Sequence, residues 1–499
     1  MRYLLLLSVF VVATCGLVYE LVAGTLASYL LGDTVTQFST VIGTYLFSMG
    51  IGSWLSRYVK RNLISLFIRV EILIGLVGGF SGAALFLVFG WAGAFRLILY
   101  GLVSITGILV GLEIPLLMRV MEGEFEFKDL ISRVFTFDYI GALAASLLFP
   151  LLLVPHLGLI RTSLMFGMMN VAVALIAIEV FKEVLPARNF LRTAVVFALA
   201  ALIAGFVASE RIQKISESAM YPGTIIHATS SPYQRVIMTR QKDDFRLYLN
   251  GHLQFSSRDE YRYHESLIHP VMSAVTGAKK ILVLGGGDGM AVREILRYPA
   301  VESITLVDLD PAVTKLFATR DDFRTLNGDA FHSPKVKIVN EDAFQWIRNY
   351  PKDFDAIVID LPDPSNYSLG KLYTQKFYSD LYPLLSPEGF GVVQSTSPLV
   401  APNSFWCVDK TLQSAGFHTF PYHCYVPSFG EWGFIIFGKK PFHPSDKFVE
   451  GLKYLDQSTF TQMCQFPPDM AKREVETNRL DNQALVHYFE SEWSKYEEF

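Results

Sequence analysis

The sequence predicts two different halves, an α-helical transmembrane bundle of about seven helices followed by an α/β domain built on a doubly wound sheet. Three observations predict this division. The 499 residues are 51% hydrophobic and only 18% charged, and the mean hydropathy is +0.33. Long apolar runs fill residues 1–212, whereas from about residue 215 short apolar runs alternate with amphipathic stretches that carry charges. An apolar excess of this size is unusual for a soluble chain of this length.

Seven apolar runs in the first half are each close to the roughly 18–20 residues that span the hydrocarbon core of a bilayer. They cover residues 3–30, 38–56, 64–90, 92–118, 135–155, 157–180 and 192–209. The first run is too long for the core of a signal peptide and no small-residue cleavage site follows it, so it is also expected to be a helix. We therefore predict seven membrane-spanning helices, with the lipid bilayer as a partner.

Five ionisable residues interrupt these apolar runs, namely Glu20, Glu71, Arg96, Glu113 and Asp138. Because a charge inside lipid is costly, such side chains are expected to face the interior of the bundle. They would there line a path for a cationic solute, or they would join helices as structural partners. The sequence leaves both interpretations open.

Beyond the bundle, the chain is expected to form a small β region (213–256), a Rossmann-like domain (257–445) and a C-terminal helical extension (446–499). The net charge is −4 and no cluster of Lys and Arg is interleaved with aromatic residues, so nucleic acid is not an expected partner. The four cysteines have neither metal-ligand nor disulfide spacing. No metal site is therefore predicted.

The most informative segment is Ile281–Met290, which reads Ile-Leu-Val-Leu-Gly-Gly-Gly-Asp-Gly-Met. It predicts a buried strand over 280–284, a tight turn over Gly285–Gly289 and a helix over 291–298. This pattern is typical of the first βα unit of a Rossmann-like, methyltransferase-type sheet. Asp288 places a carboxylate inside the turn, where the helix N-terminus would otherwise attract an anion such as a pyrophosphate.

The expected ligand is a nucleoside with a cationic tail. Asp308 ends the next apolar run, where an acidic side chain can accept hydrogen bonds from both ribose hydroxyls. S-adenosylmethionine and its decarboxylated form are such nucleosides. Asp288 disfavours the methionine carboxylate of the first and pairs well with the lone ammonium of the second, since charge-assisted hydrogen bonds are strong. The alternative is that Asp288 only caps the following helix.

Four acidic residues are expected at the carboxyl ends of strands, namely Asp288, Asp308, Asp342 and Asp360. Ligands of open α/β sheets bind beyond these ends. The run from Lys352 to Asp360 is a predicted strand, and the prolines at 362 and 364 stiffen the turn that carries Asp363. Acids converging on one edge predict a pocket for a cationic substrate.

Residues 215–440 resemble the spermidine synthase family, the polyamine aminopropyltransferases. The matching motifs are Ser231-Pro-Tyr-Gln234, Asn250-Gly-His-Leu-Gln254, Arg258-Asp-Glu-Tyr-Arg-Tyr-His264-Glu265, Gly285-Gly-Gly-Asp-Gly289, Asp308, Asp342 and Asp360-Leu-Pro-Asp-Pro364. The whole chain resembles a membrane-anchored branch of that family, in which a helical bundle precedes the synthase domain. Phe429-Gly-Glu-Trp-Gly433 and Phe466-Pro-Pro-Asp-Met470 are similar to motifs of that branch.

The resemblance implies a role for each matching residue. It assigns the nucleoside to Gln234, Gln254, Gly285, Gly287, Asp308, Asp342 and Ala343. It assigns the aminopropyl ammonium to Asp288, the acceptor channel to Tyr263 and His264, the far ammonium of the acceptor to Asp363, and the catalytic base to Asp360. Decarboxylated S-adenosylmethionine is the implied co-substrate and methylthioadenosine the implied product, with no tightly bound cofactor. A homodimer is implied as well.

Other interpretations stay open beside this one. Tyr263 and His264 are, by default, packed core residues, and Phe429 stands where the soluble enzymes have a tyrosine near the acceptor, so putrescine is not assured as the acceptor. A transporter or sensor that only binds a polyamine or a nucleoside is one alternative, against which Asp360 and Asp363 together favour catalysis. A methyltransferase that uses S-adenosylmethionine is another, which Asp288 disfavours.

Two features of the sequence indicate opposite sides of the membrane for the soluble half. Basic residues gather in alternate loops, at Arg57, Lys60 and Arg61, at Arg119, Lys128 and Arg133, and at Lys182, Arg188 and Arg192. Such loops are usually cytoplasmic, which with seven spans puts the soluble half outside. Its nucleoside is made inside cells, however, so we expect a multi-pass protein of the cell (inner) membrane with a cytoplasmic catalytic domain. An eighth span would remove the conflict.

Overall fold

The computed structural model describes residues 2–31, 34–89, 92–122, 126–350, 354–445 and 447–497. The chain divides into two compact units, Met1–Pro222 and Gly223–Phe499. The first unit extends beyond the predicted boundary at residue 212, because its last helix continues without a break to Met220.

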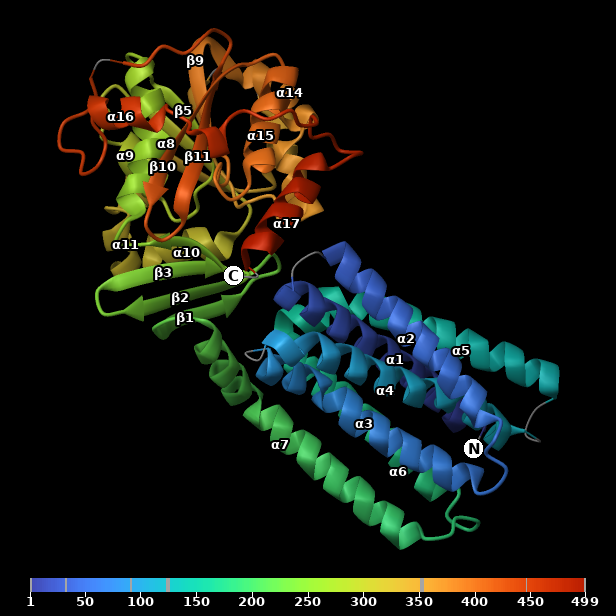
Figure 1. The fold of residues 1–499 in the computed structure, drawn as a ribbon. Coiled ribbons are helices and arrows are strands. Elements are labelled where there is room, and N and C mark those ends of the chain that lie inside the picture. The colour runs from blue at the N-terminus through green and yellow to red at the C-terminus, as the bar shows by residue number, and fades with distance from the viewer. Residues whose placement is uncertain are drawn as a thin grey trace. The chain divides into compact units, whose positions relative to one another are not determined.

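Each of the seven predicted apolar runs of the first unit forms a helix (Figure 1). The helices are α1 (Arg2–Leu31), α2 (Thr34–Ser56), α3 (Leu63–Val88), α4 (Ala92–Met121), α5 (Phe127–Leu148), α6 (Val154–Val180) and α7 (Arg188–Met220). A π-helical turn (Phe149–Leu153) continues α5, and Gly158, at φ 73°, kinks the chain within α6. The described residues of this unit contain no eighth helix, so the predicted conflict over orientation persists.

By length and composition alone, five stretches of the described residues are suited to cross a membrane. They are Tyr3–Leu30, Leu63–Val88, Phe95–Met121, Lys128–Val180 and Arg188–Met220. The fourth stretch contains both α5 and α6, whereas α2 is not among the five. Membrane spanning by all seven helices therefore stays a prediction.

Helices α3 and α6 approach each other closely because glycines line their contact. A Cβ atom on Gly75 would lie 2.7 Å from the carbonyl oxygen of Gly167, and one on Gly167 would lie 2.4 Å from the carbonyl oxygen of Gly75. Of the five ionisable residues, Glu71 and Glu113 are buried, and Glu20 and Asp138 are half-buried. Arg96 is exposed, which corrects its expected inward position. It lies in the second turn of α4, where a long side chain can extend toward the end of the helix.

The second unit begins with a four-stranded antiparallel sheet in the order β1-β2-β3-β4. Its strands are β1 (Thr224–Ser230), β2 (Arg235–Gln241), β3 (Asp244–Leu249) and β4 (His252–Ser256). The β3–β4 turn is formed by Asn250 and Gly251 at φ 49° and 89°, the left-handed conformation that tight hairpins need. The inner side chains of this sheet, such as Val236 and Phe255, pack against α10 (Pro311–Thr319).

A seven-stranded sheet in the order β10-β11-β9-β8-β5-β6-β7 forms the centre of the second unit. The strands are β5 (Lys280–Gly285), β6 (Ser303–Asp308), β7 (Val336–Asn340), β8 (Phe354–Asp360), β9 (Leu385–Gln394), β10 (His418–Val426) and β11 (Gly430–Gly438). β5 to β9 pair in parallel, whereas β11 pairs antiparallel with both β9 and β10. The predicted start of β8 at Lys352 lies outside the described residues.

Helices cover both faces of this sheet, as a doubly wound fold requires (Figure 1). One face packs against α8 (Glu260–Ala274), α9 (Met290–Ile295) and α16 (Gln457–Met463). The other packs against α12 (Ala343–Asn349), α14 (Gln375–Leu381), α15 (Pro402–Ser414) and α17 (Ala484–Glu497). Helix α9 ends at Ile295, three residues before the predicted end at 298, because the chain turns there.

The C-terminal segment is part of the domain core rather than a separate helical extension. Its two α-helices, α16 and α17, are joined by a stretch that contains only a short 3₁₀ turn. Phe460 packs in the core on one face of the sheet and Leu485 in the core on the other. The carboxylate of Glu492 accepts the backbone N–H groups of Asn403 and Ser404 at 2.9 and 3.0 Å, which fixes the start of α15.

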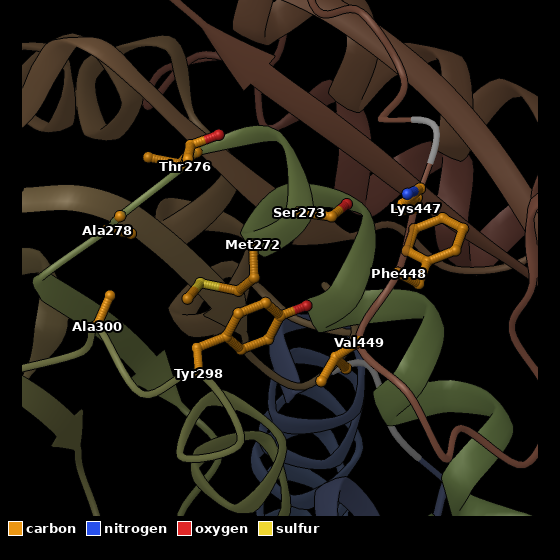
Figure 2. Close-up of a pocket in the computed structure, with 11 residues that line it drawn as sticks. Met272, Ser273, Thr276, Ala278, Tyr298, Ala300, Lys447, Phe448 and Val449 are labelled. Carbon is orange, nitrogen blue, oxygen red and sulfur yellow. The ribbon is translucent and has the colours of Figure 1, made fainter.

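A cavity of about 290 Å³ lies at the amino ends of β5 and β6, between α8 and residues 447–449 (Figure 2). Ala278 and Ala300, which precede the two strands, line it together with Met272 and Tyr298. The acids predicted for the site follow the opposite ends of the strands. This cavity is therefore not the candidate active site.

Candidate active site

The carboxyl ends of the parallel strands lie in one row. In the strand register, Gly285 pairs with Asp360 and Asp308 pairs with Asn340. Val393 pairs with Ile359, so Gln394 follows beside Asp360. The residues at these ends are therefore held by the backbone hydrogen bonds of the sheet, at the edge where ligands of such sheets bind.

The glycine turn packs directly against two of the predicted acids. Gly285 and Gly286 have φ angles of 81° and 66°, and the Gly286 N–H donates to the carbonyl oxygen of Asp360 at 3.0 Å. A Cβ on Gly285 would lie 2.1 Å from that oxygen, and one on Gly287 would lie 2.6 Å from the Asp308 carboxylate. At Gly285 both the backbone conformation and the available space exclude a side chain, whereas at Gly286 the backbone conformation disfavours one and at Gly287 the Asp308 carboxylate occupies the space.

Asp288 serves partly as a helix cap and partly as a free acid. Its Oδ1 accepts the backbone N–H of Met290 at 2.9 Å, so the capping interpretation holds for one oxygen. No donor among the described residues bonds to Oδ2. Burial raises the pKa of Asp288, although the nearby charge of His264 opposes this increase.

Asp360 accepts a short hydrogen bond from Tyr263, whose hydroxyl oxygen lies 2.6 Å from Oδ1. Burial raises the pKa of Asp360 to about 6, against the opposing charge of His264. The Tyr263 ring packs against Phe434 and Phe429, at centroid distances of 5.3 and 6.2 Å. Tyr263 therefore links the base candidate to the apolar wall that Phe429 provides.

His264 does not line an open channel, because only 2% of its surface is exposed. Its Nδ1 lies 2.8 Å from Oε2 of Glu260, and Glu260 also pairs with Arg293 at 2.9 Å. Burial disfavours the charged imidazole, but Glu260, Asp288 and Asp360 outweigh this effect and raise the pKa of His264 to about 9. The burial agrees with the alternative of a packed core histidine, here a buried cation whose charge acts on the two acids, and a role of His264 in an acceptor channel stays a prediction.

A buried polar network that the sequence interpretation missed surrounds Asp363. The Gln394 amide nitrogen lies 3.4 Å from Asp363 Oδ1 and 3.0 Å from the Tyr373 hydroxyl oxygen. The Tyr373 hydroxyl in turn donates to the backbone of Pro362 at 3.0 Å. Burial raises the pKa of Asp363 to about 7. Gln394 could have been found by extending the strand-end argument to β9, the neighbour of β8.

The predicted ribose-binding acid, Asp308, is held by the backbone of Asp310. The sequence interpretation also missed Asp310. Asp308 Oδ1 accepts the Asp310 N–H at 2.9 Å, and burial raises the pKa of Asp308 to about 6. Asp310 Oδ2 accepts hydrogen bonds from Ser231 and Gln234 at 2.7 and 2.9 Å. Gln234, in the loop between β1 and β2, is thereby held beside the residues that follow β6, and its contact with a nucleoside stays a prediction.

Among the described residues, no hydrogen bond or ion pair joins three other predicted residues to these acids. Asp342 caps α12 through Phe344 and pairs with Lys371 at 2.6 Å, so both its oxygens are engaged. Ala343 is the buried first residue of that helix. Gln254 makes a local bond to His252 on β4. Their contacts with a nucleoside stay predictions.

Comparison with known proteins decides the family. The spermine/spermidine synthase domain matches residues 260–447. Over 499 residues the chain is 54% identical to polyamine aminopropyltransferase 2 of Ralstonia nicotianae, with 98% of each chain covered. It is 52% identical to the polyamine aminopropyltransferase of Leptospira interrogans, with 99% of each covered. The chain belongs to the polyamine aminopropyltransferase family.

Among solved structures, a spermidine synthase in complex with the transition-state analogue AdoDATO matches this aminopropyltransferase at 26% identity. It covers 49% of this chain and 85% of that chain, with a TM-score of 0.46.

The site of this aminopropyltransferase carries an excess of negative charge. Asp288, Asp360 and Asp363 share one edge of the sheet, and the buried counter-charge that acts on the first two is His264. Carboxylates that burial keeps basic attract cations and can accept a proton near neutral pH. The described residues contain no group of three or more His, Cys, Asp or Glu side chains arranged to hold a metal ion.

Proposed function

We propose that this enzyme transfers the aminopropyl group of decarboxylated S-adenosylmethionine to an amine acceptor such as putrescine, releasing methylthioadenosine and a longer polyamine. The observation that carries the proposal is the juxtaposition of the glycine turn with Asp288, Asp308 and Asp360 at one sheet edge. Family membership supports aminopropyl transfer over both a methyltransferase and a binding-only transporter or sensor.

The reaction needs a positioned amine more than it needs an acid. The acceptor nitrogen attacks the methylene carbon next to the sulfonium, a C–N bond forms, and the C–S bond breaks with its electron pair passing to sulfur. Because the leaving group is a neutral thioether, it requires no proton. The attacking nitrogen must lose one, and Asp360, with a pKa of about 6, is ionised and able to accept it at neutral pH. Holding the two reactants in line supplies much of the remaining rate.

The acceptor side is supported by Asp363 and Tyr263. Asp363 offers a buried carboxylate for the far ammonium of a diamine, oriented by Gln394. Phe429 packs beside Tyr263 without a hydroxyl, so this wall contributes apolar contact only. This composition suits an acceptor with a methylene chain between two ammonium groups, of which putrescine is one example.

The rate of transfer is expected to fall in acid, because Asp360 and Asp363 both act as anions. With pKa values of about 6 and 7, both carboxyls gain protons as the pH falls from 8 to 5. kcat/KM should therefore fall more steeply than tenfold per pH unit, the limit that protonation of a single group allows. Asp363→Asn should remove the higher step and leave the lower one, and comparing the two profiles cancels the titration of the acceptor itself. Identical profiles for both enzymes would rule out ionisation of Asp363 as a requirement.

We also propose that the helical unit crosses the inner membrane and that the enzyme is a homodimer with its catalytic unit in the cytoplasm. The seven apolar helices support the first point. All four cysteines are free in the structure, which suits a reducing compartment. The intracellular supply of the nucleoside supports the same side, whereas the basic loops favour the opposite one. The homodimer rests on the family resemblance.

The orientation has a direct test. Protease added to sealed inside-out vesicles is expected to cleave the catalytic unit, while right-side-out vesicles should protect it. An epitope tag after Phe499 provides the readout, and detergent-opened vesicles are the control. Cleavage in right-side-out vesicles only would contradict the proposed side and agree with the charge distribution.

A further inference from the structure

Two buried carboxyl groups meet inside the helical unit, and neither belongs to the candidate active site. Glu71 on α3 is 0% exposed and Glu113 on α4 is 1% exposed. The two carboxyl groups are neighbours, because one atom, the side-chain nitrogen of Asn170, contacts both of them. No lysine, arginine or histidine of the described residues forms an ion pair with either one. A pair of bare carboxylates in such a place would carry two uncompensated charges, which burial does not tolerate.

A single amide group holds the pair from one side. The side-chain nitrogen of Asn170 on α6 donates to Glu71 Oε2 at 2.8 Å and to Glu113 Oε1 at 3.2 Å. The Tyr19 hydroxyl on α1 donates to the Asn170 side-chain oxygen at 2.8 Å, which keeps the amide nitrogen turned toward the carboxyls. The amide nitrogen therefore donates to one oxygen of each carboxyl group, and it adds no ligand for a metal cation.

The remaining two carboxyl oxygens of the pair lack a hydrogen-bond donor. Glu71 Oε1 and Glu113 Oε2 are fully buried and have no hydrogen-bond partner among the described residues. One proton held between the two carboxyl groups would satisfy both oxygens, while Asn170 satisfies the other two. Every buried acceptor of the pair would then be paired, as buried polar groups normally are.

We propose that Glu71 and Glu113 form a proton-binding site in which the two carboxyl groups share one dissociable proton. Helices α3 and α6 approach each other closely at Gly75 and Gly167, one turn along each helix from Glu71 and Asn170. The packing around the pair is therefore tight, which suits a proton better than a hydrated ion. The site joins four helices at positions well inside each of them. A proton that binds and leaves there makes the packing of the helical unit depend on pH, beyond a passive role as an anchor.

Other titratable side chains face the pair and have to be considered in any titration. Cys15 and Tyr19 on α1 lie close enough to interact electrostatically with both acids. Tyr45 on α2 and Asp138 on α5 interact with Glu113. Asp138 is half-buried, so it is the acid neighbour nearest to the surface of the unit.

The test is infrared difference spectroscopy of the full-length protein in lipid nanodiscs, following the carbonyl stretch of protonated carboxyl groups as the pH is changed. The unmutated protein should show such a band that is lost at high pH. Glu71→Gln and Glu113→Gln should each abolish it, because a glutamine amide supplies the missing donor without a dissociable proton. Glu20→Gln, which alters a half-buried acid of α1 outside the pair, should leave the band unchanged.

A fourth variant separates a shared proton from a merely buried acid. Asn170→Leu removes the donor that stabilises the charged form, so the band should persist to a pH at least one unit higher. Thermal unfolding of each variant checks that the fold is retained. Absence of a titrating band in the unmutated protein, or its persistence at an unchanged midpoint in both glutamine variants, would overturn the proposal.

Discussion

Replacing Asp360 by Asn is expected to lower turnover by about 10²–10⁴-fold, the range that general bases contribute. Asn has nearly the same shape and can still accept the hydrogen bond of the Tyr263 hydroxyl. It cannot accept the proton of the attacking amine. Binding of the nucleoside should be retained, because the glycine turn packs against the backbone of Asp360, which the substitution does not alter. Single-turnover kinetics at saturating donor and acceptor would measure the loss.

Asp342→Asn is the matched control for this variant. Asp342 is an acid at the same sheet edge, but its oxygens are engaged by the start of α12 and by Lys371. Its substitution should change turnover at saturating donor by only a few fold. Near-normal transfer by Asp360→Asn would remove Asp360 from the mechanism.

Asp288→Asn is expected to reduce the preference of the enzyme for decarboxylated S-adenosylmethionine over S-adenosylmethionine. In the proposed binding mode, the tail of the nucleoside ends at the turn that carries Asp288, where the carboxylate of S-adenosylmethionine would meet a like charge. At an effective dielectric constant near 20, two charges about 4–5 Å apart repel by roughly 3–4 kcal/mol, an upper figure. The buried charge of His264 reduces it. Even a third of this repulsion is about tenfold in affinity.

The Asp288→Asn substitution tests the effect of the negative charge alone, because Asn can still cap the start of α9. Its side-chain oxygen can still accept the Met290 N–H, so the start of α9 should be unaffected. Competition of the two nucleosides for the variant would measure the remaining preference. If the preference were as large as in the unmutated enzyme, selection would not come from the charge of Asp288.

The parts of the site that local sequence predicts are those fixed by strand ends. A buried apolar run that stops at an acid places that acid at the sheet edge, which is why Asp308 and Asp360 are predictable to the residue. The glycine turn is equally local, since Gly285 and Gly286 need positive φ angles that the sequence signals directly. The seven helices follow in the same way from the length of their apolar runs.

The parts that sequence does not predict depend on contacts between distant segments. The ion pair of Asp342 with Lys371 joins residues that no spacing rule connects. It engages an acid that the sequence placed in the pocket only because it is an acid at an expected strand end. The sequence offers His264 both as a channel residue and as a packed core residue, and the structure buries it against Glu260, one helical turn away. The meeting of Glu71, Glu113 and Asn170 needs three helices to pack in one particular way.

The most direct test of the account is calorimetric titration of the unmutated full-length enzyme with each nucleoside in turn. The central claim is that a carboxylate in the glycine turn selects a nucleoside whose tail carries an ammonium and no carboxylate. The account predicts that decarboxylated S-adenosylmethionine binds at least about tenfold more tightly than S-adenosylmethionine. Equal affinity for the two would contradict it.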